Sequence, residues 1–267
     1  DFNLSTGSVS LAEPTDLTMS FGLVLDDKQS MQLELATTLE IASGFSAIAA
    51  SDLDLDIQLS GPELPGGSIE MKGGVESLNL NLDDGELSVK GLLAQALGAS
   101  LEAQLTGTAV TSDSPRIKGT IKVPAMNLRE VLAKTGSPMV TGDPEAMSSF
   151  GLDAALAYDG KSAVLSDLKA VLDQTRLDGR FSIVDLDRQA MTFDLAVDAI
   201  DLDRYLPPAE EDADKDSSDA QADEELDLSG LKSLNAKGQL KVGELRLSGL
   251  VFTDALVTVN ASGGVLR

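Results

Sequence analysis

The sequence predicts a mainly β protein, built as an elongated antiparallel sheet with a few short helices. Two observations favour this fold class: apolar and polar residues alternate in many short runs, and turn signals separate the runs at even spacing. Successive strand side chains point to opposite faces, so each run has one apolar and one polar face. Such strands are typical of an antiparallel sheet with one solvated side, and their short, even spacing favours a meander over βαβ units.

The predicted strands follow from the alternation itself. It is without fault in Leu-Asp-Leu-Asp-Ile-Gln-Leu at 53–59, and it recurs at 31–35, 78–83, 191–195, 239–242, 244–247 and 255–259. Clusters of Gly, Pro, Asp and Ser separate the runs and predict turns at 26–27, 65–67, 72–74, 83–85, 113–115, 159–160 and 262–264.

Short helices or single helical turns are expected at 127–135, 143–150, 202–206 and 228–234. Asn127 is a favourable N-cap for the first helix, and Gly136 ends it. The second begins at Asp143-Pro144-Glu145, which combines a cap, a proline at the first helical position and an acid in the first turn.

The chain divides into three parts. Residues 1–208 form a repeated β segment, 209–227 an acidic insertion that we expect to be disordered, and 228–267 the continuation of the β segment. The insertion holds ten acidic residues and one lysine, and its lack of apolar residues prevents it from forming a core. Residues 117–128 and 191–202 also form a weak repeat, in which a strand leads into a short helix. Such repeats favour an elongated sheet that stacks unit on unit.

Composition excludes several classes of function. The chain carries a net charge of −24 and contains no His, Cys or Trp. Ser-His-Asp and Cys-His nucleophiles are therefore excluded, as are the usual zinc, haem and iron–sulfur sites. The negative charge repels phosphates, so we expect no nucleic-acid partner. We predict no catalytic residue, no metal site and no cofactor. The acidic residues at 212–223 match the calcium-binding loop of an EF-hand only poorly, because Ser217 occupies the position at which that loop requires glycine.

We expect the chain to be a fragment of a longer protein, because residues 1–4 and 264–267 both look like strand material cut in mid-pattern. The first residues show no basic stretch followed by an apolar one, as a signal peptide would, and the sequence contains no run of about 18 apolar residues that could span a bilayer as a helix. The alternation is compatible both with an open apolar gutter, formed by a curled sheet without a second layer, and with a closed β-sandwich. Without other information the sandwich is favoured.

Several stretches from about residue 118 onward resemble the C-terminal part of the AsmA family of Gram-negative envelope proteins. The most specific is Ile-Asp-Leu-Asp-Arg-Tyr-Leu-Pro-Pro at 200–208. The others, in chain order, are 123–132, 142–147, 168–179 with an L-D-x-T-x-L-x-G turn, 231–238 and 245–250. Residues before about 75 match only as alternating strands.

This resemblance implies a curved sheet that forms an open apolar groove, and it favours the gutter over the sandwich. It also implies a periplasmic location, with a full-length protein anchored in the inner membrane by an N-terminal helix that this chain lacks. Members of the family are implicated in moving phospholipid toward the outer membrane or in supporting outer-membrane assembly. They offer no catalytic residues for comparison.

A groove for phospholipid acyl chains needs only a continuous apolar lining. We expect six residues to contribute to its inner face: Leu78, Leu80, Leu82, Phe193, Leu195 and Val197. Ordinary core packing is the alternative role for each of them. The alternative function is an envelope scaffold, which binds an outer-membrane assembly protein through strand edges or the acidic insertion and carries no lipid.

Overall fold

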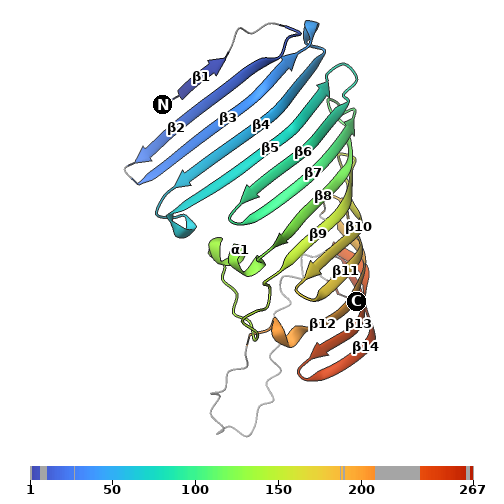
Figure 1. The fold of residues 1–267 in the computed structure, drawn as a ribbon. Helices are drawn as coiled ribbons and strands as arrows, with labels where there is room; N and C mark the ends of the chain where they lie inside the picture. The colour runs from blue at the N-terminus through green and yellow to red at the C-terminus, as the bar shows by residue number, and fades with distance from the viewer. Residues whose placement is uncertain are drawn as a thin grey trace.

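The computed structural model describes residues 2–6, 11–26, 28–186, 188, 190–207, 235–262 and 265–266. These residues form one 15-stranded sheet, whose spatial order is the order of the strands along the chain (Figure 1). The strands are β1 Phe2–Thr6, β2 Thr15–Asp26, β3 Gln29–Ile41, β4 Ala47–Ser60, β5 Ser68–Asn81, β6 Leu87–Ala96, β7 Ala99–Thr108, β8 Arg116–Met126, β9 Phe150–Tyr158, β10 Ala163–Leu172, β11 Thr175–Asp185, β12 Ala190–Asp201, β13 Asn235–Leu247, β14 Leu250–Ser262 and β15 Val265–Leu266.

The strands are antiparallel, as predicted, with one exception. Strands β12 and β13 are parallel, with Val197 opposite Val242. Tight turns can join only antiparallel neighbours, whereas parallel neighbours need a long crossover connection. Residues 202–234 supply that length between the end of β12 and the start of β13.

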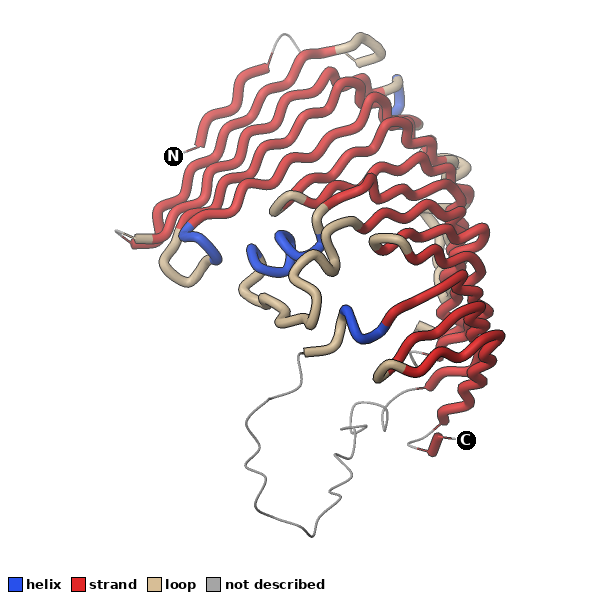
Figure 2. Tube along the Cα trace, turned by 60° about the horizontal axis from the view of Figure 1, so that its bottom comes forward, coloured by secondary structure: helices blue, strands red, loops and turns tan. Residues whose placement is uncertain are grey.

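The sheet is a single curved layer, as the fold prediction required, and not half of a sandwich. Figure 2 shows it curving around α1 and the loop that follows this helix. Among the described residues no large side chain is fully buried, and six of the ten buried apolar residues are alanines. A closed sandwich would bury its large aliphatic side chains between two sheets, so one face of this sheet has no second layer over it in the described part of the chain.

The register shifts at several places in the sheet, and at three of them, in β4, β6 and β10, a β-bulge interrupts the regular alternation. Each contains a residue with positive φ: Asp52 at 51°, Gly91 at 63° and Asp167 at 50°. The register shifts at each bulge. An extra residue bends its strand and increases the local twist, so the bulges favour curvature of the sheet. They also transfer the apolar face between even and odd positions within one strand, from even to odd in β4 and from odd to even in β6 and β10.

The first predicted helix is confirmed. Helix α1, Leu128–Lys134, is capped by the Asn127 side chain, which accepts the N–H of Glu130 at 3.1 Å. Gly136 follows the helix with φ 77°. The predicted turn at 202–206 is also present, as the 3-10 helix η3, Leu202–Arg204. Two further 3-10 turns lie at η1 Ser43–Phe45 and η2 Pro65–Gly67.

The predicted helix at 143–150 is wrong, because this segment forms turns. Asp143 still caps locally, since its side chain accepts the N–H of Glu145 at 2.9 Å. However, the N–H groups of Met147 and Ser149 bind the Asp173 carboxylate instead of helix carbonyls, and Met147 has φ 63°. Tertiary contacts thus outweigh a strong local start signal. The predicted acidic insertion at 209–227 and the predicted turn at 228–234 lie outside the described residues.

Candidate functional site: the apolar face of the sheet

Directly paired residues of neighbouring strands share a face of the sheet, so the register traces which side chains line up across it. One row runs through β3 to β14 and contains only apolar residues and glycine: Leu39, Ala50, Leu78, Val89, Leu105, Gly119, Leu156, Leu165, Phe181, Phe193, Gly238 and Val259. At about 4.8 Å between strands, this first row extends for roughly 50 Å along the sheet.

A second row crosses the same strands two residues away from the first row, nearer to the end of β3 and the start of β4. It consists of Ile41, Ile48, Leu80, Leu87, Gly107, Ile117, Tyr158, Ala163, Ile183, Met191, Ala236 and Ala261. Tyr158 is its only residue with a polar side-chain atom. We call the face that carries these two rows the apolar face.

Five of the six predicted groove residues lie in strands on this face. Leu78 and Phe193 belong to the first row, although six strands lie between β5 and β12 in the sheet. Leu80 belongs to the second row. Leu195 and Val197 alternate with Phe193 on β12, and Val197 is 9% exposed. The sixth, Leu82, lies in the turn after β5, where its N–H donates to Ser46 O.

A hollow of about 480 Å³ lies on the apolar face. Its apolar lining comprises Leu55, Ile57, Met71, Gly73, Ala94, Ala96, Ala99, Leu101, Val123, Met126 and Phe150. Small side chains create the space, because β5, β6 and β7 contribute Gly73 and three alanines where other strands contribute leucine or valine. None of these residues was among those predicted. A run of small residues within apolar positions was the available signal.

The opposite face of the sheet is polar and carries a ladder of alternating charge. Glu102, Lys122, Asp153, Lys169 and Asp178 pair in turn across five strands. The Lys122 Nζ atom lies 3.9 Å from Glu102 Oε2, and both side chains are about half exposed. Exposed pairs of this kind contribute little free energy, but opposite charges directly across a sheet favour one register over its neighbours.

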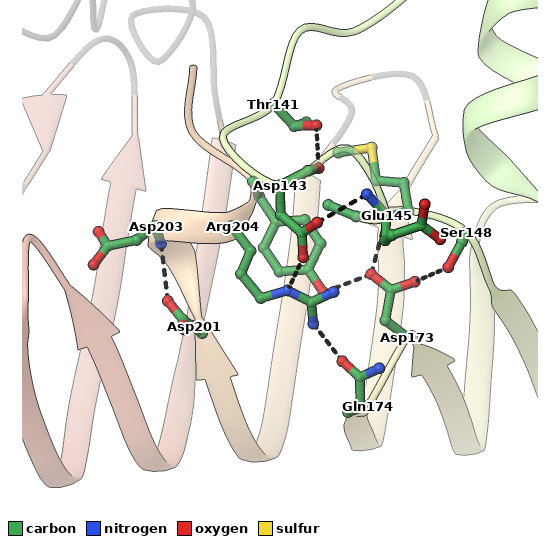
Figure 3. A network of polar contacts seen from close by, with 12 residues as sticks. Thr141, Asp143, Glu145, Ser148, Asp173, Gln174, Asp201, Asp203 and Arg204 are labelled. Atoms are coloured by element: carbon green, nitrogen blue, oxygen red, sulfur yellow. Dashed lines mark hydrogen bonds and ion pairs between the residues drawn. The ribbon is translucent and has the colours of Figure 1, made fainter. Parts of the chain in front are cut away.

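A polar network lies beside the hollow and joins three loops (Figure 3). The carboxylate of Asp173, in the β10–β11 turn, accepts the N–H of Met147 at 2.8 Å, the N–H of Ser149 at 3.1 Å and the hydroxyl of Tyr205 at 2.9 Å. Arg204 Nε donates to Asp143 Oδ2 at 2.7 Å. The network therefore fastens the segment between β8 and β9 to the β10–β11 turn and to η3.

Hydrogen bonds and partial burial together shift the pKa values of these groups. The N–H of Glu145, followed by the Arg204 guanidinium, lowers the pKa of Asp143. Partial burial of Asp173 favours its neutral form, but the N–H groups of Met147 and Ser149 and the Tyr205 hydroxyl outweigh this and lower its pKa. Burial, and then the hydrogen bond to Asp173, raise the pKa of Tyr205. Both aspartates are therefore carboxylates at neutral pH.

Within the described ranges, no group of three or more acidic side chains is arranged to hold a metal ion. Nor is any helix in that part of the chain long and apolar enough to cross a bilayer. A search of family models, of curated proteins and of solved structures found no match to this chain.

Proposed function

We propose that this chain is the periplasmic part of an AsmA-like protein in outer-membrane biogenesis, and that its apolar face carries phospholipid acyl chains between the inner and outer membranes. The full-length protein is then anchored in the inner membrane. The observation that carries the proposal is the pair of apolar rows, which run uninterrupted from β3 to β14.

Physical chemistry supports an acyl chain as the occupant of this face. Soluble proteins rarely expose large contiguous apolar surfaces unless these bind a partner, a ligand or lipid. A hydrocarbon chain has no directional groups, so aliphatic rows without hydrogen-bonding partners suit it. The hollow offers mainly aliphatic and alanine contacts, and its volume lies within the range of ligand pockets. The sequence resemblance at 200–208 supplies the biological setting of the proposal.

A matched pair of leucines tests lipid binding. Leu101 and Leu93 are each 37% exposed on neighbouring strands, but Leu101 lines the hollow while Leu93 lies on the polar face opposite Glu102. We expect Leu101→Asp to reduce the phospholipid that co-purifies with the chain at least about fivefold, because a carboxylate in an acyl-chain path must be desolvated. Lipid extraction followed by mass spectrometry measures this amount.

Leu93→Asp is the control and should retain lipid at the wild-type level. Circular dichroism of both variants establishes that the sheet has formed. Equal lipid content in wild type and Leu101→Asp would contradict the proposal, as would a wild-type chain that carries no phospholipid when it is purified from a Gram-negative host.

A second candidate function, a scaffold for an outer-membrane assembly protein, is favoured by strand β14. Among the described residues β14 pairs outward with β15 only at Ala261 and Ser262. Leu250, Val251, Phe252, Leu256 and Val257 on this strand are 45–60% exposed. An unpaired edge with apolar side chains is able to accept a partner strand. Charged substitutions at Val251 and Leu256 would abolish binding of such a partner and leave lipid content unchanged.

A further inference from the structure

Residues 127–149, which we call the strap, leave the sheet and return to it at the wall of the hollow. Met126 immediately precedes the strap and Phe150 immediately follows it, and these two residues are paired across β8 and β9. Both line the hollow. Any change in the position of the strap therefore acts at the edge of the apolar site.

The strap also reaches the opposite wall of the same hollow. The Lys134 side chain at the end of α1 approaches the β6–β7 turn, since an added Cβ on Gly98 would lie 3.2 Å from Lys134 Nζ. Ala96 and Ala99, which flank this turn, line the hollow. Figure 2 shows α1 and the following loop on the inner side of the curved sheet. The strap thus extends across one end of the hollow.

Polar contacts, with little apolar burial, hold the strap in this position. Helix α1 contains no buried residue, and Ala146 is the only buried side chain between residues 127 and 149. The attachments are the Asp173 carboxylate, the Arg204–Asp143 ion pair and the hydrogen bonds from Gly142 N–H to Leu206 O and from Asp143 N–H to Arg204 O.

Water can replace contacts of this kind at a modest net cost, because an intramolecular hydrogen bond gains little free energy over the bonds that both groups make to water. Segments with few buried apolar contacts open locally at low free energy while the rest of the fold remains intact. The attachment of the strap depends most on Asp173, whose carboxylate accepts the backbone N–H groups of two strap residues, Met147 and Ser149.

We propose that the strap is a gate over the apolar hollow and that Asp173 holds it closed. Release of Asp173 removes the attachment at Met147 and Ser149, so that mainly the contacts of Gly142 and Asp143 to Leu206 and Arg204 still hold the strap. When these also exchange for water, residues 127–149 move about their bases at Met126 and Phe150 and uncover the end of the hollow at Ala96 and Ala99. That an acyl chain enters the hollow rests on the proposed function. The opening of the gate is a property of the chain alone and is measured without lipid.

Hydrogen exchange measures the opening. We expect Asp173→Asn to speed the exchange of the α1 amides at least about tenfold and to leave the amides of β8, β9 and β12 unchanged. Asp159→Asn is the matched control: Asp159 also accepts two backbone N–H groups, from Lys161 and Ser162, but in the β9–β10 turn at the other strand ends. Tyr205→Phe removes one donor to Asp173 and should give a smaller acceleration.

Thiol labelling measures access to the hollow. The chain has no cysteine, so Ala99→Cys introduces a single reporter. We expect a bulky maleimide to label Cys at this position at least about fivefold faster when Asp173→Asn is added, while a reporter at Ala163, in the second row at the start of β10, keeps its rate.

Four results would overturn the gate: unchanged α1 exchange in Asp173→Asn, loss of protection throughout the sheet, an equal effect of Asp159→Asn, or faster α1 exchange without faster labelling at position 99. A chain that carries no phospholipid would contradict the proposed function alone, because neither measurement uses lipid.

Discussion

At the residue scale, the apolar face depends on glycines that make room for large neighbours. Gly238 lies opposite Phe193 in the first row. A Cβ added at Gly238 would lie 2.6 Å from Phe193 Cγ and closer still to the Phe193 carbonyl oxygen. By contrast, a Cβ at Gly73 would meet Leu93 O at 3.6 Å and Leu55 Cδ2 at 4.0 Å, which are ordinary contacts. A side chain at position 238 would therefore clash with Phe193, whereas position 73 has room for a methyl group.

These two positions give a paired stability prediction. We expect Gly238→Ala to lower the free energy of unfolding by about 1–3 kcal/mol, the usual effect of forcing extra atoms into a packed site. Gly73→Ala should be neutral or slightly stabilising, because alanine reduces the entropy of the unfolded chain. Urea unfolding followed by circular dichroism compares them. Equal effects of both substitutions would mean that neither the ring nor the carbonyl oxygen of Phe193 constrains position 238.

At the element scale, aspartates organise the turns and loops at the strand ends. Asp173, Asp143 and Asp203 hold the loops around the strap, with Asp203 accepting the N–H groups of Ser248 and Gly249. The N–H of Gly249, followed by that of Ser248, lowers the pKa of Asp203. At the other strand ends, the N–H groups of Ser162 and Lys161 are the main cause of the lowered pKa of Asp159.

The lowered pKa values predict how stability depends on pH. A carboxyl whose pKa is lower in the folded than in the unfolded chain contributes stability above its unfolded pKa, about 3.9, and loses this contribution as pH falls through the folded value. The difference in unfolding free energy between wild type and Asp173→Asn should therefore be constant above about pH 5 and shrink below about pH 4. Denaturant titrations at several pH values measure it. A difference that grew on acidification would contradict the assignment.

At the scale of the whole molecule, every substantial contact between strands joins neighbours in the chain order. The described part of the sheet therefore resembles a repeat array, in which stability is set by each unit and its two neighbours. This explains how such a sheet persists without a large buried core: each inner strand, from β2 to β13, pairs its backbone hydrogen-bonding groups with the strands on either side.

Local unfolding should follow from this arrangement. We expect Leu35→Ala in β3 to reduce amide protection in β2 to β5 by about 1–2 kcal/mol, at or below the usual cost of deleting a buried leucine, because Leu35 is only half-buried. Protection in β10 to β13 should not change. Hydrogen exchange resolved by segment measures both regions. A uniform loss across all strands would instead indicate a single cooperative unit.

The sequence alone determined the strands and their faces. Alternation is a local property, since a residue two positions away lies on the same side of a strand whatever surrounds it. It therefore placed Leu78, Leu80, Phe193, Leu195 and Val197 on apolar strand faces, and the N-cap at Asn127 was equally local. That these faces form one continuous surface follows from register, which pairs Leu78 and Phe193 into a single row through intervening strands.

Only the tertiary structure decided the remaining features, because each depends on residues distant in sequence. The parallel pairing of β12 and β13 depends on where a long connection returns to the sheet. The hollow arises where Gly73 from one strand meets alanines from two others. The segment at 143–150 does not form the predicted helix because the Asp173 carboxylate binds the N–H groups of Met147 and Ser149. Local alternation defines which side of each strand is apolar, whereas the shape of the shared surface depends on packing between strands.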